Sequence, residues 1–143
     1  MFTSAAPLAI DAAILFAAAF AWAKGALPER VGGLINLAAA VLAVCVHLVV
    51  GAHALSTFLL AIDGLLALGF LGLALRYASL WLGGALLCQG VQFSLHAFYL
   101  VSNRRFDFSY ALVNNLNSWG IVACILVGTW ASWRRSNSLA QAA

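Results

Sequence analysis

The chain has 143 residues, of which 65% are apolar, and it carries only seven Lys/Arg and four Asp/Glu. Soluble domains average roughly 45–50% apolar and about 25% charged residues, so this chain has too few charged side chains for a water-facing surface. The composition therefore excludes a soluble enzyme, a secreted disulfide scaffold and a disordered segment. It predicts an all-α integral membrane protein that forms a single domain in the lipid bilayer.

Five apolar stretches have about the 17–25 residues that a helix needs to cross a bilayer. They cover residues 6–23, 31–54, 57–75, 80–102 and 110–133. Pro28 lies where a second helix can begin without losing a needed N–H, and polar segments at 53–56, 76–79 and 103–109 separate the later stretches. We expect a bundle of five spans followed by a short, fraying cytoplasmic tail at 136–143.

The first stretch is the weakest of the five because it is short and contains Asp11. Ala21-Trp22-Ala23 also resembles a signal-peptide cleavage site. A signal peptide has a basic segment before its apolar core, but no Lys or Arg precedes this stretch. We therefore expect a retained first helix. The alternative is four spans preceded by an N-terminal helix that lies in the membrane interface.

The basic residues predict how the bundle is oriented. With five spans, Arg104 and Arg105 face one side of the membrane, and the other five basic residues face the opposite side; these are Lys24, Arg30, Arg76, Arg134 and Arg135. The positive-inside rule then puts the N-terminus outside and the C-terminus in the cytoplasm. Trp22, Trp81, Trp130 and Trp133 fall at the same inner interface, where tryptophan is enriched. The overall pattern is typical of a small bacterial inner-membrane protein.

Two other residue classes carry no specific signal. The basic residues occur singly or in pairs at the edges of apolar stretches, which argues against a nucleic-acid partner, since that needs a clustered basic surface. Cys45, Cys88 and Cys124 lie far apart within apolar stretches. No Cys/His spacing typical of a metal site occurs, so we expect the cysteines to act as small apolar side chains.

The fourth span carries a polar stripe on one helical face. Its members are spaced by three and four residues: Gln89, Gln92, His96, Tyr99 and Asn103. The second span presents a matching face of small residues around Asn36 and His47. Small residues allow close helix packing, so we expect these two faces to point into the bundle.

The polar side chains also share a depth. His47 and His96 each lie about seven residues from the outer end of their spans, or roughly 10 Å below the interface, and Asp63 comes to a similar level. We therefore predict a one-sided pocket in the outer half of the bundle, built by His47, Asp63, Gln89, Gln92, His96, Tyr99, Asn114 and Asn117. The alternative for each amide is an ordinary hydrogen bond between helices.

Three functions of different classes fit these residues. No GxSxG, HExxH, P-loop or GxGxxG motif occurs, which favours a non-catalytic subunit or assembly factor of a membrane complex, or of a homo-oligomer. Such a protein would hold a partner helix, a lipid or a small ligand in the pocket. His47 and His96 could instead ligate a b-type haem, although the sequence names no cofactor by itself. Asp63 and the histidines could also move protons, cations or small solutes.

Overall fold

The computed structural model describes residues 5–142, with the side chains of all these residues except 5, 6, 52, 53 and 142. It contains the helices α1 (Ala5–Lys24), α2 (Leu27–Val49), α3 (Ala52–Tyr77), α4 (Leu80–Val101) and α5 (Phe108–Ala142). Within the described range there are no strands, so the predicted all-α fold class is confirmed. Each helix is long and apolar enough to cross a membrane.

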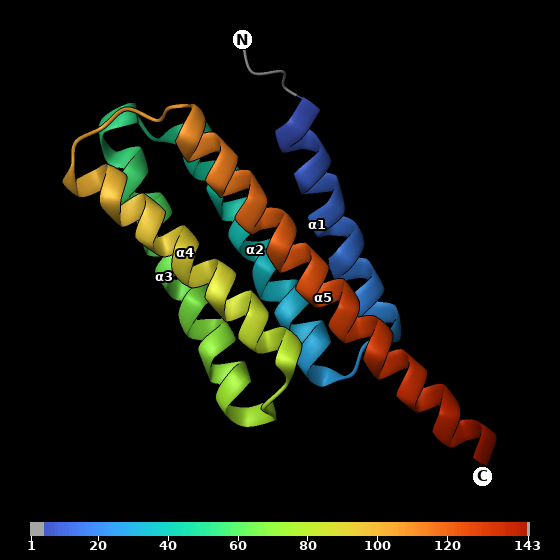
Figure 1. Cartoon of the computed structure of the whole chain (residues 1–143). Coiled ribbons are helices and arrows are strands. Elements are labelled where there is room, and N and C mark those ends of the chain that lie inside the picture. The colour runs from blue at the N-terminus through green and yellow to red at the C-terminus, as the bar shows by residue number, and fades with distance from the viewer. Residues whose placement is uncertain (1–4, 143) are drawn as a thin grey trace.

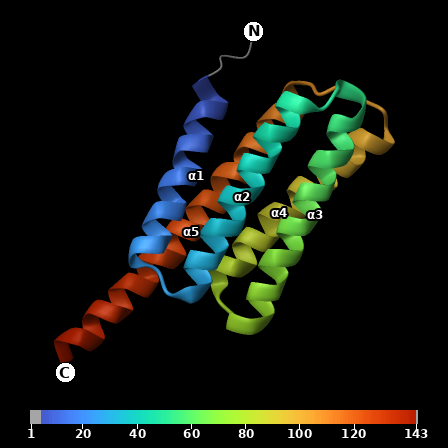
Figure 2. The same cartoon turned by 180° about the vertical axis from the view of Figure 1, so that it is seen from behind.

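The five helices alternate in direction and form a ring that follows the order of the chain (Figure 1). Each helix packs against the next one, and α5 returns to pack against α1 and more lightly against α2. Figure 2 shows that the start of α1, the α2–α3 turn and the α4–α5 loop lie together at one end. We call this the N-terminal end of the bundle. The C-terminal end holds the α1–α2 and α3–α4 turns and the last turns of α5.

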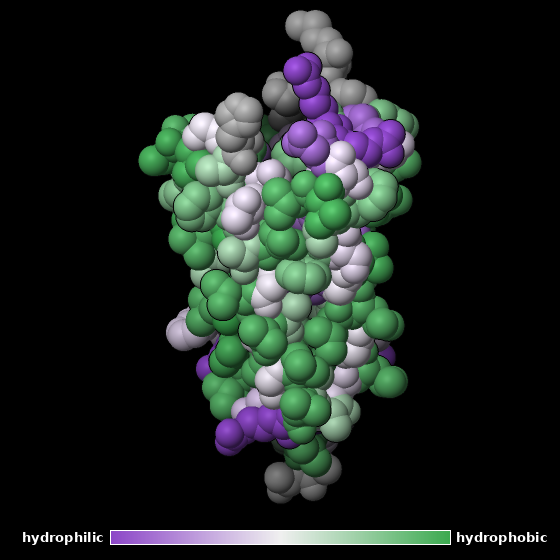
Figure 3. All heavy atoms as spheres, turned by 90° about the vertical axis from the view of Figure 1, so that its left-hand side faces the viewer, coloured by the Kyte–Doolittle hydropathy of each residue, from purple (hydrophilic) through white to green (hydrophobic). Residues whose placement is uncertain are grey.

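The outer surface of the ring is apolar between two more polar ends (Figure 3). Large exposed side chains come from every helix; examples are Leu15, Leu48, Leu65, Leu87 and Leu116. Soluble monomeric proteins rarely expose apolar patches of this extent. The surface therefore fits contact with lipid tails around the whole bundle.

Some helix boundaries differ from the predicted spans. The turn between α2 and α3 lies at Val50 and Gly51, where both residues have extended backbone angles. The predicted turn at 53–56 is instead the first part of α3, whose N-cap residue is Gly51. At the other end of α2, the helix begins at Leu27 because the Glu29 carboxylate accepts a hydrogen bond from the Ala26 N–H at 3.0 Å.

The tail also differs from its prediction. Residues 136–142 continue α5 as a regular helix past the bundle (Figure 1). Ser136 and Ser138 donate their hydroxyl hydrogen bonds to the carbonyls of Ser132 and Arg134, one turn earlier. These bonds satisfy the two serine hydroxyls within the helix itself.

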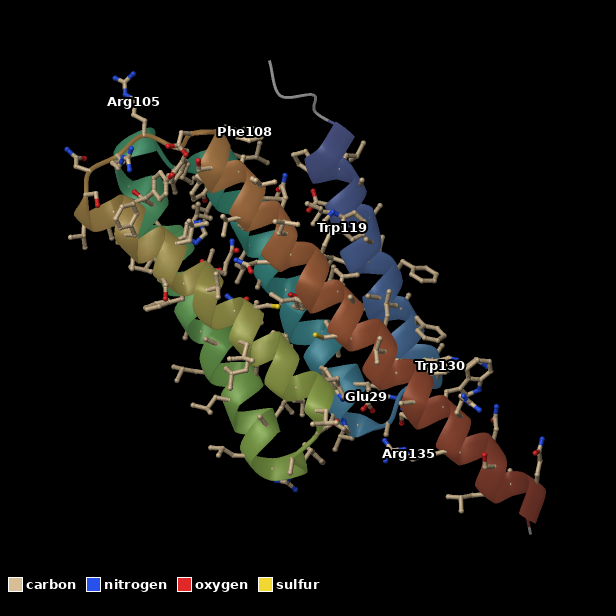
Figure 4. The ribbon with its side chains drawn as sticks, viewed as in Figure 1. Glu29, Arg105, Phe108, Trp119, Trp130 and Arg135 are labelled. Carbon is tan, nitrogen blue, oxygen red and sulfur yellow. The ribbon has the colours of Figure 1, made fainter. Side chains whose placement is uncertain are left out.

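The C-terminal half of the bundle is filled around Trp81. A Cβ atom placed on Gly128 would lie 2.5 Å from the Trp81 ring, and one placed on Gly32 would lie 2.7 Å from it. The indole is thus held between two glycines, and its Nε1–H donates to Glu29 Oε1 at 3.0 Å. Trp81 is only 7% exposed. Trp81 therefore packs inside the bundle and does not face lipid, whereas Trp130 lies on the outside (Figure 4).

Small residues also allow α4 and α5 to pack closely against each other. A Cβ on Gly84 would lie 2.9 Å from Cys124 Sγ, and a Cβ on Gly120 would lie 2.8 Å from Cys88 Sγ. Each cysteine therefore fills the space left by a glycine on the facing helix. Around them Phe70, Leu82 and Ile125 are fully buried, which leaves this half of the bundle densely packed.

Candidate functional site

A cavity of about 530 Å³ lies in the half of the bundle nearer the N-terminal end, and all five helices line it. Its volume is within the roughly 300–1,000 Å³ typical of small-molecule sites. Six of the predicted pocket residues line it: His47, Asp63, Gln89, Gln92, His96 and Asn114. Figure 4 shows nitrogen and oxygen atoms gathered between α4 and α5 toward the end where Phe108 is labelled.

Asp63 on α3 and His96 on α4 form a buried pair at the wall of the cavity. The Nδ1 atom of His96 contacts Asp63 Oδ2, and Gln89 Nε2 donates to Asp63 Oδ1 at 3.0 Å. The same amide also donates to the Asp63 carbonyl oxygen at 3.2 Å. An unpaired carboxylate is expensive in hydrocarbon; here two side chains from α4 satisfy it.

The other ring nitrogen of His96 bonds to a residue that the sequence analysis omits. His96 Nε2 contacts the hydroxyl of Tyr110, in the first turn of α5, and the two rings meet edge to face. Asp63, His96 and Tyr110 thus link α3, α4 and α5. The spacing of Tyr110, Asn114 and Ser118 by four residues was the signal available in the sequence, since it places all three on one face of α5.

A second amide contact crosses the same cavity. Gln92 Nε2 donates to Asn114 Oδ1, and Ser118 donates to the carbonyl oxygen of Asn114. Gln92 is 7% exposed, and its Oε1 is buried without a hydrogen-bond partner among the described residues. A buried unsatisfied acceptor costs about 1–3 kcal/mol. This atom is therefore a place where a bound molecule could supply a donor.

Two predicted pocket residues do not line the cavity. Tyr99 donates its hydroxyl hydrogen bond to Asp107 Oδ1 at 2.6 Å, in the loop before α5. Asn117 is on α5, and its buried Nδ2 has no partner among the described residues. The helical spacing predicted the face of α4 on which Tyr99 lies. The last turn of α4 is beside the α4–α5 loop, however, and there the Tyr99 hydroxyl bonds to Asp107 instead of lining the cavity.

Asp107 is part of the helix end and lies outside the cavity. Its Oδ1 accepts the N–H of Tyr110 at 2.9 Å, in addition to the Tyr99 hydroxyl. These two hydrogen bonds, the one from Tyr99 foremost, hold the pKa of Asp107 below its usual value. The carboxylate is therefore charged at neutral pH and caps the N-terminus of α5.

Asp11 on α1 and His47 on α2 also line the cavity, and both side chains are exposed. Asp11 lies within a candidate span and has no hydrogen bond or ion pair to any described residue. His47 Nδ1 bonds to the carbonyl oxygen of Ala43 at 3.0 Å. Asp11 is not among the predicted pocket residues.

The floor of the cavity separates it from the packed C-terminal half. Leu66 and Ile121 line the cavity and also belong to the core that contains Phe70 and Trp81. On the α1 side, Ala18 and Ala21 pack against Gly33, whose Cβ position is 3.2 Å from each of them. Leu66 and Ile121 thus lie between the cavity and the packed C-terminal half.

The arrangement of the histidines bears on the haem hypothesis. Both ring nitrogens of His96 are engaged, one by Asp63 and the other by Tyr110. Axial ligation would have to break one of these bonds inside the bundle. Among the described residues, no group of three or more His, Cys, Asp or Glu side chains is placed to hold a metal ion.

Comparisons with known proteins provide no relative from which a function could be inferred. No family model, curated protein or solved structure matches this chain. What is established is an integral membrane protein of five apolar helices. Within the described part of the bundle, its half nearer the N-terminal end contains a cavity with apolar walls and a few polar side chains.

Proposed function

We propose that this protein is a non-enzymatic membrane component that binds a small amphipathic molecule in the cavity. The observation that carries the proposal is Gln92 Oε1, a buried acceptor without a partner among the described residues, on a side chain that lines the cavity. Binding sites typically combine apolar walls with a few polar groups that fix orientation. Here Ile10, Leu59 and Ile121 contribute apolar walls.

The one-sided shape supports a binding site rather than a transport path. A route for solutes continues across the membrane and is lined by polar groups. Below the cavity, Phe70 is fully buried and Trp81 fills the space between Gly32 and Gly128. The bonds at both nitrogens of His96 likewise weigh against a haem carrier.

We further propose the orientation and the setting. Lys24, Arg30 and Arg76 lie at or beside the C-terminal end, with Arg134 and Arg135 on the continuation of α5, while Arg104 and Arg105 lie in the loop of the N-terminal end. The positive-inside rule places the C-terminal end in the cytoplasm, as in a bacterial inner membrane. In that setting the protein would serve as an accessory subunit or homo-oligomer whose cavity opens toward the outer leaflet.

The cavity can be tested by filling it. Ala40 lines the cavity, so a phenylalanine there occupies ligand space, whereas Ala38 on the same helix is exposed and does not line it. With 1-decanol as the probe, we expect the wild-type chain to bind it in phosphatidylcholine nanodiscs, measured by native mass spectrometry. Ala40→Phe should weaken binding roughly tenfold or more, since it displaces buried apolar contacts.

Ala38→Phe is the matched control, because it adds the same ring to the lipid-facing side. It should bind 1-decanol like the wild-type chain. Circular dichroism and gel filtration identify a variant that fails to fold. A folded Ala40→Phe protein that binds 1-decanol with unchanged affinity would show that the cavity is not the binding site.

A further inference from the structure

Among the described residues that line the cavity, the one buried side-chain nitrogen or oxygen atom without a hydrogen-bond partner is an acceptor. Gln92 Oε1 has no donor among the described residues. His47 Nδ1 bonds to the Ala43 carbonyl oxygen, which can only accept, so the Nδ1 carries the proton. No described residue bonds to Nε2, which accepts a hydrogen bond in the tautomer that is protonated at Nδ1 alone.

The charged side chains of the cavity also favour a ligand that donates hydrogen bonds. Asp11 and Asp63 both line it, whereas its described lining includes no Lys, Arg or Trp, the side chains that can only donate. Asp63 is matched by His96 and Gln89. Asp11 has no partner among the described residues, so its carboxylate is the uncompensated charge of the cavity lining.

Unpaired acceptors and an unpaired carboxylate are best satisfied together by a cation that carries N–H groups. Hydrogen bonds to charged groups are stronger than those between neutral groups. The opposite ligand type, a phosphate or carboxylate, would meet Asp11 without a Lys or Arg from the described lining to compensate it. The apolar walls at Ile14, Leu59 and Ile62 suit a hydrocarbon body attached to the cation.

We infer that the cavity binds an amphipathic amine, with a protonated nitrogen bearing N–H groups on an apolar body. This inference rests on the proposed function, since it names the ligand class of the same cavity. Asp11 supplies the charge for the ammonium group, and Gln92 Oε1 and His47 Nε2 supply acceptors. The amine can be a free alkylamine or the amino group of a phospholipid such as phosphatidylethanolamine.

The test compares four probes with the same ten-carbon tail at pH 7: 1-decylamine, decyltrimethylammonium, 1-decanol and decanoate. Binding is measured by isothermal titration calorimetry on phosphatidylcholine nanodiscs, with empty nanodiscs subtracted. We expect 1-decylamine to bind roughly tenfold or more tightly than 1-decanol, the size of one charge-assisted hydrogen bond. Decyltrimethylammonium has the charge without N–H groups and should bind more weakly than 1-decylamine.

Asp11→Asn should reduce the affinity for 1-decylamine to near that for 1-decanol and leave 1-decanol binding unchanged. Asp107→Asn is the control, because it removes the same charge from the same end of the bundle outside the cavity. It should keep the preference for the amine. Gln92→Met should also weaken the binding of 1-decylamine more than the binding of 1-decanol.

The remaining outcomes separate the two proposals. If all four probes bind equally and Ala40→Phe abolishes binding, the cavity is a binding site but the amine inference is wrong. Preference for decanoate, or equal binding of the two cations, also overturns the inference. If no probe binds, both proposals fail. Where the amine preference holds, competition by phosphatidylethanolamine in the nanodisc identifies a lipid amine, and lack of competition identifies a free one.

Discussion

Asp63→Leu is expected to lower the free energy of unfolding by about 3 kcal/mol. The substitution removes the acceptor of both Gln89 and His96 in a buried position, and each buried donor left without a partner costs about 1–3 kcal/mol. Single hydrogen bonds between membrane helices average only about 0.6 kcal/mol. Asp63 should exceed that value because two side chains converge on one carboxylate.

The measurement is unfolding of the purified chain in mixed micelles, followed by circular dichroism during a titration with sodium dodecyl sulfate. Asp11→Leu is the matched control, since it makes the same change at a carboxylate of the same cavity that has no partner among the described residues. Removing an unpaired charge from a candidate span should leave stability unchanged or increase it.

A double-mutant cycle isolates the pair. Asp63 and His96 contact each other directly. The effects of Asp63→Leu and His96→Leu on the free energy of unfolding should therefore not be additive. The loss in the double variant should then be smaller than the sum of the single losses by at least about 1 kcal/mol. Strict additivity, or a loss for Asp63→Leu no larger than that for Asp11→Leu, would show that the pair does not stabilise the bundle.

Trp81→Ala is expected to cost about 3–5 kcal/mol, the range for a buried large aromatic residue. The indole fills the space between Gly32 and Gly128, and neither glycine has a side chain that could occupy the void. Glu29, which is 3% exposed, also loses the indole donor to its Oε1. Both effects act on the half of the bundle that closes the floor of the cavity.

Trp130→Ala is the control, because that indole is 49% exposed on the outside of α5. It should change the free energy of unfolding much less in the same titration. Adding Gly128→Leu to Trp81→Ala should recover part of the loss, since the new side chain would enter the void. Equal losses for Trp81→Ala and Trp130→Ala would contradict the packing described above.

The sequence was sufficient to predict the helices and much of the cavity wall. Apolar length alone predicted five spans, and the spacing of Gln89, Gln92 and His96 placed them on one face that points into the bundle. Depth arithmetic also placed Asp63 at the level of His96, and the structure shows that the two side chains contact each other. These predictions depend only on helical geometry, which is set locally by the chain.

Features that depend on two distant segments were missed. Trp81 is buried because Gly32 and Gly128, on two other helices, leave room for its ring. Tyr99 follows the polar stripe but bonds to Asp107 in the next loop. Tyr110 was treated as the start of a span, so its bond to His96 could not be anticipated from the stripe on α4 alone.

The most direct test of the one-sided cavity is the reactivity of single cysteines from each side of the membrane. In a chain whose Cys45, Cys88 and Cys124 are replaced by alanine, Ala43→Cys places a thiol in the cavity and Ala85→Cys places one in the packed C-terminal half. A charged, membrane-impermeant methanethiosulfonate should label Ala43→Cys only from the N-terminal end. It should label Ala85→Cys from neither end. Labelling of Ala43→Cys from the C-terminal end, or from neither end, would contradict a polar cavity that opens on one side of the membrane.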